Sequence, residues 1–408
     1  MNIRRSRRAF LRSSAVGTTA YITGFPTIVS SLRPSVIVVG AGAFGGWSAL
    51  HLAERGAKVT LFDAWGPGNS RASSGGETRT IRATYGPAQS LYVGMVARGL
   101  QMWQDYEQKW GVKLFFRSGA LRLASGDGAY ESAALPILHQ AGIRYEKLSA
   151  VESAKRWPQI NFDGVAWSVL EPDSGFLAAR RACEAVLNAF LKAGGQYRQA
   201  QISLGSITAR RMDEIRLENG EALTADVYVF ALGPWLGKLF TFLDAKITPT
   251  RQEVFFFGTP AGDVRFDEDH LPTWIDGGSQ PFFGVPGNHW RGFKIADDTR
   301  GPAIDPTTME RQISLPKLES VRAYLRLRFP ALRNSPLLEN RVCQYENSTD
   351  HNFILDRHPE ATNVWIVGGG SGHGFKHGPV MGEMVADAIL EARSTPAEMN
   401  LRRTSLAS

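Results

Sequence analysis

One segment near the N-terminus constrains the fold more than any other. The short, β-branched run over 35–39 predicts a fully buried strand. The sequence Gly40-Ala41-Gly42-Ala43-Phe44-Gly45 follows at once and leads into a helical run that stops at Gly56. A second predicted strand over 58–62 ends on Asp63. Strand, glycine loop, helix, strand and acid in this order predict a Rossmann-like α/β unit that binds a dinucleotide.

Each glycine of the loop has its own expected task. Gly40 makes the tight turn, Gly42 lets the backbone approach a pyrophosphate, and Gly45 allows close packing of helix on strand. The free N–H groups and positive dipole end of the helix point at the phosphates. Asp63, 23 residues after Gly40, can accept hydrogen bonds from a ribose diol. The motif alone does not separate FAD from NAD.

The formal charge of +7 invites comparison with nucleic-acid-binding proteins, so its distribution matters. The first 34 residues contain six arginines and no acidic residue, which leaves only +1 for the rest of the chain. Because the excess charge belongs to this leader, we expect no nucleic-acid partner. The arginines of the leader are Arg4, Arg5, Arg7, Arg8, Arg12 and Arg33.

The leader itself carries a targeting pattern. Ser6-Arg7-Arg8-Ala9-Phe10-Leu11-Arg12 resembles the twin-arginine export motif, and the apolar stretch over 15–29 is too short and too polar to predict a membrane span. We therefore expect residues 1–34 to be a leader read by the twin-arginine translocation machinery, which exports folded proteins, and the protein to be periplasmic. Cleavage of the leader and its retention as a tether both remain open, and a disordered basic tail is the alternative.

The remaining composition is that of an ordinary soluble protein. The chain has 408 residues and a hydrophobic fraction of 43%, enough for two domains with a sizeable core. Cys183 and Cys343 are too few for a disulfide framework, and nothing in the sequence brings them together into a single bond. We predict no metal site.

Further elements follow from hydrophobic periodicity. Aromatic, Gly and Pro residues over 250–300 predict an antiparallel sheet with turns. A glycine-rich turn over 368–376 leads into a helix opened by Pro379. The other predicted elements are helices over 91–110 and 177–193 and strands over 114–123, 227–231 and 364–367.

Three blocks of the sequence resemble monomeric sarcosine oxidase and N-methyltryptophan oxidase, FAD-dependent amine oxidases of the D-amino-acid-oxidase-like superfamily. The resemblance extends over about 35–395, and the 33-residue interval from Cys343 to Lys376 fits it. The third block is short and weaker than the others. The blocks are 73–85 (SSGGETRTIRATY), then Cys343-Gln344-Tyr345 with 353–360 (FILDRHPE) and 370–376 (GSGHGFK), and Gly292-Phe293-Lys294.

The resemblance implies an α/β fold in which the flavin lies between two domains. One is a discontinuous, Rossmann-like FAD-binding domain with a mostly parallel sheet, and the other is a substrate domain with a larger antiparallel sheet. The implied ranges are 35–108, 175–248 and 332–394 for the FAD-binding domain, 109–174 and 249–331 for the substrate domain, and 395–408 for a C-terminal tail.

The resemblance also assigns residues around the flavin. Cys343 would carry the flavin through a thioether to its 8α carbon, whereas a buried apolar thiol is the alternative. Arg79 would lie by the ring system, and Thr78 would contact it. The turn before Pro379 would direct a helix dipole at the pyrimidine edge and favour the anionic reduced form. The residues that this turn contributes are Gly370, Gly372, His373, Gly374 and Lys376.

On the substrate side, the resemblance makes Arg82 and Lys376 a pair that clamps an amino-acid carboxylate and holds its α-carbon over flavin N5. Tyr345 would be a retained active-site residue. Lys294 would be the oxygen-activating lysine on the opposite face, where its charge lowers the barrier to superoxide formation. Surface cations and a solvated strand lysine are the ordinary alternatives for these three charges.

Two positions depart from the family pattern. Phe283 stands where sarcosine oxidase has a tyrosine before a Gly-x-Pro turn, and Asp298 stands where it has a histidine four residues after the lysine. The pocket would lose a hydroxyl group and gain a negative charge. This favours a substrate with an apolar body or an extra cationic group over sarcosine itself, although a solvated loop acid remains an alternative for Asp298.

The implied reaction is the oxidation of a secondary or N-substituted amino acid by a monomer. A hydride equivalent passes from the carbon beside nitrogen to flavin N5, water hydrolyses the imine, and O2 is reduced to H2O2; no obligatory general base is expected. The first alternative is an exported dehydrogenase that passes electrons to a quinone or another carrier and does not need Lys294. The second is a flavin-retaining binding protein without turnover. An NAD-dependent dehydrogenase fits worst, because it leaves the block over 343–376 unexplained.

Overall fold

The computed structural model describes residues 33–86, 89–287 and 291–407. The predicted twin-arginine motif and the apolar stretch after it lie outside the described residues. Across the described ranges, no helix is both long and apolar enough to span a membrane.

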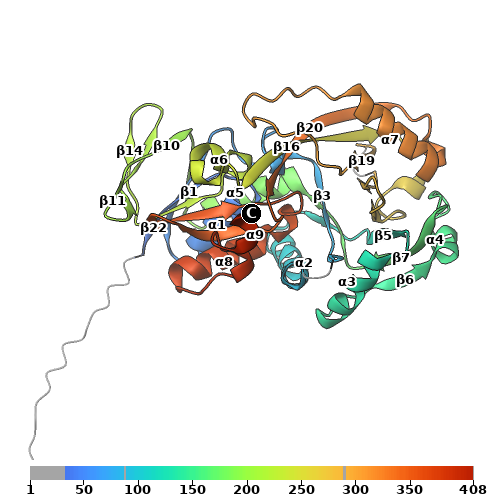
Figure 1. Ribbon diagram of the computed structural model, residues 1–408, viewed down its shortest axis with the longest axis horizontal. Coiled ribbons are helices and arrows are strands. Elements are labelled where there is room, and N and C mark those ends of the chain that lie inside the picture. The colour runs from blue at the N-terminus through green and yellow to red at the C-terminus, as the bar shows by residue number, and fades with distance from the viewer. Residues whose placement is uncertain (1–32, 87–88, 288–290, 408) are drawn as a thin grey trace, which may run out of the picture. The chain divides into compact units, whose positions relative to one another are not determined.

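A six-stranded sheet is built around the N-terminal unit (Figure 1). All its neighbouring strands pair in parallel except β21 and β22, which pair antiparallel. The predicted mostly parallel sheet is therefore confirmed. Its order is β21 (Ile354–His358), β22 (Ala361–Gly368), β15 (Val227–Phe230), β1 (Ser35–Val39), β2 (Lys58–Asp63) and β9 (Gln196–Gln199).

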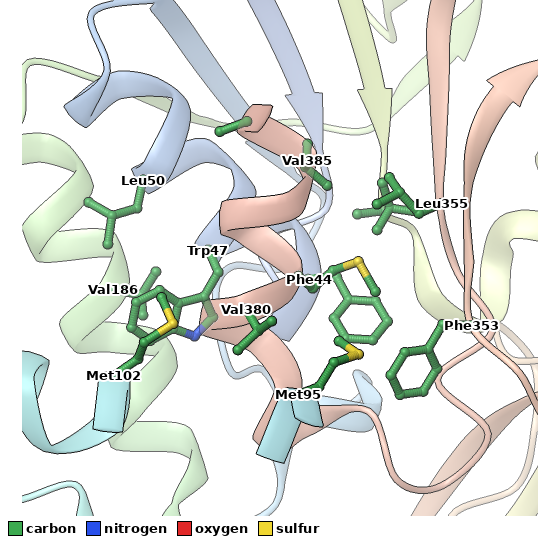
Figure 2. Close-up of a cluster of buried hydrophobic side chains, with 14 of the residues drawn as sticks. Phe44, Trp47, Leu50, Met95, Met102, Val186, Phe353, Leu355, Val380 and Val385 are labelled. Carbon is green, nitrogen blue, oxygen red and sulfur yellow. The ribbon is translucent and has the colours of Figure 1, made fainter. Parts of the chain in front are cut away.

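The strands of this sheet are buried on both faces, as a continuous apolar run predicts. Val36 and Val38 of β1 belong to one core cluster, whereas Ile37 and Val39 belong to another on the opposite face. Figure 2 shows the first cluster, in which side chains of several helices meet Leu355 of β21. These helices are α1 (Ala43–Glu54), α2 (Ser90–Trp110), α5 (Ala179–Lys192) and α8 (Gly378–Leu390).

A larger sheet of eight strands supports the rest of the site. Its neighbours pair antiparallel except β17 and β5, which are parallel. A helix, α7 (Leu315–Arg328), packs on it through an aromatic cluster that includes Trp274 and Tyr324. The order is β20 (Leu337–Ser348), β16 (Ile247–Phe257), β19 (Phe293–Asp297), β18 (Phe282–Val285), β17 (Thr273–Asp276), β5 (Ala120–Ser125), β7 (Val165–Glu171) and β6 (Glu146–Ser149).

One predicted element is wrong at its start. The helix expected over 177–193 begins at Ala179, because Leu177 and Ala178 end the strand β8 (Gly175–Ala178). This strand pairs with β3 (Thr78–Ile81) and with β4 (Phe115–Phe116). A short apolar run suits a buried strand or a buried helix equally well, and here distant pairing partners decide.

The long strand β20 connects the two sheets. It pairs with β16 along its whole length and is followed by β21 of the six-stranded sheet. Residues 343–346 therefore lie where the chain passes from one sheet toward the other. Further small elements are β10 (Ile202–Leu204), β13 (Ile215–Leu217), β14 (Ala222–Leu223), β11 (Ile207–Thr208), β12 (Arg211–Met212), α3 (Ala129–Gln140), α4 (Ala150–Arg156), α6 (Leu236–Leu239) and α9 (Thr404–Ala407). The residue ranges of the two domains stay a prediction.

Candidate active site

A cavity of about 500 Å³ lies at the carboxyl ends of β1, β2 and β22. Ligands of open α/β sheets bind at this edge. The lining includes Gly40, Gly42, Asp63, Trp65, Ser73, Arg79, Trp235, Lys238, Tyr345, Glu346, Gly370, Gly372 and Gly374.

The glycine loop forms one wall of the cavity, and two of its positions accept no side chain. Gly40 has a φ of +104°, and a Cβ there would overlap the carbonyl oxygen of Ala231. Gly45 lies behind the loop, where a Cβ would overlap the carbonyl oxygen of Gly40. The N–H of Ala43, at the start of α1, donates to Ser74 Oγ over 3.0 Å. The loop and the helix N-terminus thus present backbone at the cavity, as an anionic group requires.

Asp63 supports this loop from the end of β2. Its carboxylate accepts N–H groups from Ala41 at 2.8 Å, Trp65 at 2.9 Å and Gly66 at 2.8 Å. Burial raises the pKa of Asp63, and these three N–H groups oppose the shift. A carboxylate has about four acceptor positions, so one position is left for a ligand.

The segment around β3 brings Arg79 beside Cys343. The Arg79 guanidinium donates to the carbonyl oxygens of Thr78, at 2.8 Å, and Ser73, and its Nη2 lies 3.7 Å from Cys343 Sγ. Both cysteines are free and buried, but burial raises the pKa of the Cys183 thiol to about 12. The guanidinium of Arg79 therefore lies in contact with the Cys343 sulfur.

Lys294 approaches the same segment from β19 of the other sheet. Its Nζ donates to Thr78 O at 2.9 Å and lies 5.6 Å from the centre of the Phe283 ring. The residue is only 3% exposed, and burial, followed by the charge of Arg79, lowers the pKa of Lys294 to about 7. This lysine is therefore a desolvated cation close to its titration point, and not a solvated strand lysine.

A second cluster joins Arg82 and Lys376 across one aromatic ring. Arg82 Cζ lies 4.9 Å and Lys376 Nζ 5.1 Å from the centre of the Tyr85 ring. Arg82 also donates to Thr84 O, and Lys376 Nζ donates to His373 O at 3.0 Å. Burial, followed by the charge of Arg82, lowers the pKa of Lys376 well below its ordinary value. Within the described ranges, neither cation forms a salt bridge.

Glu171, on β7, fixes the loop that carries Arg82. Its carboxylate accepts the N–H groups of Ala83 and Thr84, each at 2.7 Å, and the hydroxyl groups of Thr84 at 2.5 Å and Ser174 at 2.6 Å. Sequence reasoning missed this residue, because an isolated glutamate carries no motif. A fully buried acid at the end of an apolar strand is the signal that would have singled it out.

Asp298 is not a solvated loop acid. It accepts the Tyr345 hydroxyl group at 2.9 Å, and burial raises the pKa of the Asp298 carboxyl. The Tyr345 hydroxyl group and the charges of Arg300 and Arg82 oppose this shift. Asp298 and Arg82 therefore interact electrostatically, and a place for Asp298 in the substrate pocket stays a prediction.

The predicted site residues thus fall into separate places. Eight predicted cofactor or catalytic residues line the cavity: Gly40, Gly42, Asp63, Arg79, Tyr345, Gly370, Gly372 and Gly374. Seven others lie outside its lining: Gly45, Thr78, Arg82, Lys294, Cys343, His373 and Lys376. His373 belongs to an aromatic cluster, in which its Nδ1 lies 3.0 Å from the Tyr85 hydroxyl oxygen. Sequence reasoning missed Trp65, Trp235, Lys238 and Glu346, which belong to no recognisable motif, and gave no role to Ser73, the first residue of the block over 73–85.

Comparison with known proteins decides the family. A family model described as "FAD dependent oxidoreductase" matches residues 35–388 of this chain. The chain belongs to this family. It is therefore an FAD-dependent oxidoreductase, and its membership carries no statement about the substrate.

The similar proteins agree with this assignment. A monomeric sarcosine oxidase from Bacillus sp. (strain B-0618) is 31% identical over 374 residues, which cover 88% of this chain and 93% of that protein. An N-methyl-L-tryptophan oxidase from Salmonella arizonae is 28% identical over 379 residues, which cover 88% and 95%. Among solved structures, L-proline dehydrogenase from P. horikoshii superposes with a TM-score of 0.79 at 20% identity, covering 90% of this chain and 96% of that one. This last likeness establishes the fold.

The cavity fits the cofactor of the family. Its glycine wall presents backbone without side chains, and the N-terminal residues of α1, Ala43 and Phe44, line it. Two buried polar atoms of its lining, Ser73 Oγ and Glu346 Oε1, have no hydrogen-bond partner among the described residues. Buried polar atoms without partners indicate a ligand that supplies them. The described part of the chain contains no group of three His, Cys, Asp or Glu side chains that could hold a metal ion.

Proposed function

We propose that the protein oxidises secondary or N-substituted amino acids with FAD and passes the electrons to O2. The observation that carries this proposal is the pair Arg82 and Lys376. Two buried cationic side chains that form no salt bridge with any described residue are costly, so the site favours an anionic ligand. A substrate carboxylate supplies this charge and leaves the amine end of the substrate free.

The residues that would hold FAD are those of the cavity. Gly40, Gly42 and the N-terminus of α1 would take the phosphates, and the remaining acceptor position of Asp63 would take a ribose hydroxyl group. When bound, FAD would accept the two electrons of a hydride equivalent from the C–H bond of the carbon beside the substrate nitrogen.

The contribution of the protein to the reaction is orientation and electrostatics. Arg82 and Lys376 bind the carboxylate, and Glu171 holds the loop of Arg82, so the substrate enters in one orientation. The neutral amine supplies its own electron pair, so no side chain has to remove a proton from carbon. The substrate loses two electrons and becomes an imine, which water hydrolyses, and O2 gains two electrons and two protons to give H2O2.

Lys294 supports O2 as the electron acceptor. A desolvated cation that donates to Thr78, next to the cavity residue Arg79, would stabilise the negative charge that develops on O2. A dehydrogenase that delivers electrons to a carrier does not need such a buried cation.

The substrate class is tested by anaerobic bleaching of the flavin. Phe283 and Asp298 favour N-substituted amino acids with an apolar body or a second cationic group. We expect these compounds to bleach the flavin faster than sarcosine, and the same amines without a carboxylate to bleach it far more slowly. Stopped-flow absorbance with matched pairs of compounds measures both differences. Equal bleaching by acids and decarboxylated amines would contradict the clamp, and no bleaching by any amine would contradict the reaction.

We also propose that Cys343 holds the flavin covalently. Acid-precipitated wild-type protein is then expected to keep its yellow colour, whereas Cys343→Ser should release FAD into the supernatant. Cys183→Ser is the matched control and should behave as the wild type does, because burial raises the pKa of the Cys183 thiol to about 12 and so disfavours the reactive thiolate. Absorbance of pellet and supernatant measures both. Loss of colour from the wild type would refute the thioether and leave FAD binding intact.

Finally, we propose that the protein is a periplasmic monomer exported by the twin-arginine pathway. The basic, acid-free leader supports this proposal. Replacing Arg7 and Arg8 together by lysine should retain the protein in the cytoplasm with flavin bound, as fractionation and flavin absorbance would report. Normal export of this double variant would mean that another pathway reads the leader.

A further inference from the structure

One ionisable side chain of the cofactor cavity is incompletely partnered. Five such side chains line the cavity. Four have partners within the part of the protein that the structure describes: Asp63, Arg79, Lys238 and Tyr345. The fifth is Glu346, whose Oε1 is buried and has no hydrogen-bond partner among the described residues. A half-satisfied buried carboxyl group indicates a missing partner.

The position of Glu346 places this carboxyl group beside the glycine-rich turn. It lies on β20, opposite Pro249 of β16, and is 6% exposed. Its Oε2 accepts the N–H of Gly370 at 3.4 Å, and its backbone carbonyl accepts the N–H of Ser371 at 2.7 Å. A Cβ at Gly368 would overlap Oε1, so the glycine leaves the room that this acid occupies.

The surroundings of Glu346 favour its neutral form. Pro249, the glycines of the turn, η1 (Ser73–Gly75) and η2 (Gly233–Trp235), which pack on β20, contain no titratable side chain. Burial raises the pKa of Glu346 to about 7, and only the N–H groups of Gly369 and Gly370 oppose the shift. Below that pH the carboxyl group keeps its proton and has an O–H to donate.

We propose that Glu346 is a cofactor-binding residue that donates a hydrogen bond from a neutral carboxyl group to an acceptor atom of bound FAD. The carbonyl, ring-nitrogen, hydroxyl and phosphate groups of FAD are all acceptors, so Oε1, which has no partner among the described residues, has one in the holoenzyme. Ionisation removes the donor and places a negative charge beside the cofactor. The inference rests on FAD binding alone and is independent of the proposed substrate and electron acceptor.

The test is a pH titration of the flavin absorbance of the oxidised holoenzyme. Because the pKa of Lys294 is also lowered to about 7, the titration is made in Lys294→Met. We expect a one-proton step centred near pH 7 in this background. Adding Glu346→Gln should abolish the step and leave the spectrum of the low-pH form, because the amide is a permanently neutral donor. Adding Glu339→Gln, on the same strand but paired with Arg291, should leave the step unchanged.

If the Glu346→Gln variant does not fold, a second measurement still tests the proposal. Infrared difference spectra of Lys294→Met across the same pH range should contain a carboxylic-acid carbonyl band, shifted in D2O, that disappears with the midpoint of the absorbance step. Three results would each overturn the proposal. The flavin spectrum of Lys294→Met could lack the step, or the step could survive in the glutamine variant. The carboxylic-acid band could also fail to follow the absorbance.

Discussion

Lys294→Met is expected to slow the reaction of the reduced enzyme with O2 by about 10²–10³-fold, because one well-placed charge in a desolvated site contributes about 3–4 kcal/mol. Anaerobic reduction by substrate should change far less, since Arg82 and Lys376 hold the substrate. Stopped-flow measurement of the two half-reactions separates these effects. Lys109→Met, an exposed lysine on α2, is the control and should change neither.

We also expect the rate of the reaction with O2 to depend on pH. The wild-type rate with O2 should fall as the pH rises through about 7, where Lys294 loses its charge, and the methionine variant should lack this fall.

The lowered pKa of Lys294 also affects stability, because the unfolded chain holds this proton more tightly than the folded one does. The charge therefore destabilises the folded state fully below about pH 7 and progressively less up to its ordinary pKa of 10.5. Lys294→Met should raise the free energy of unfolding at neutral pH by a few kcal/mol. Wild-type oxidation rates in the variant would assign the electrons to a carrier instead.

Lys376→Ala should show the reverse pattern. Losing one charge-assisted contact of about 1.5–3 kcal/mol should weaken substrate binding by roughly 10–100-fold, with a near-normal reaction of the reduced enzyme with O2. Arg82→Lys should weaken binding less than Arg82→Ala, because the charge stays and only the bidentate geometry is lost. Anaerobic titration of the flavin spectrum with substrate measures these affinities.

Two comparisons sharpen this prediction. An amine that lacks the carboxylate should bind wild type and Lys376→Ala alike, because the lysine has no other contact with the substrate. Glu171→Gln should affect carboxylate-bearing substrates only, as expected of a residue that positions Arg82. A Lys376→Ala variant that binds the amino acid with wild-type affinity would remove the clamp from the proposal.

The sequence by itself determined the elements whose interactions are local. The unit of β1, glycine loop, α1, β2 and Asp63 was predicted within one residue, because buried runs, glycine positions and helix stops act between near neighbours. Pairing between distant segments was beyond local patterns. Leu177 and Ala178 read as helix, but β3 and β4 hold them in a strand.

The site divides in the same way. Motif resemblance named Lys294, Cys343 and Arg82, but only the tertiary structure brought Lys294 to Thr78, 216 residues away in the chain, and Arg79 to Cys343, 264 residues away. The charge states were likewise decided by the fold. Burial between two sheets lowers the pKa of Lys294 and raises that of Glu346, and desolvation by distant segments leaves no mark in the sequence around either residue.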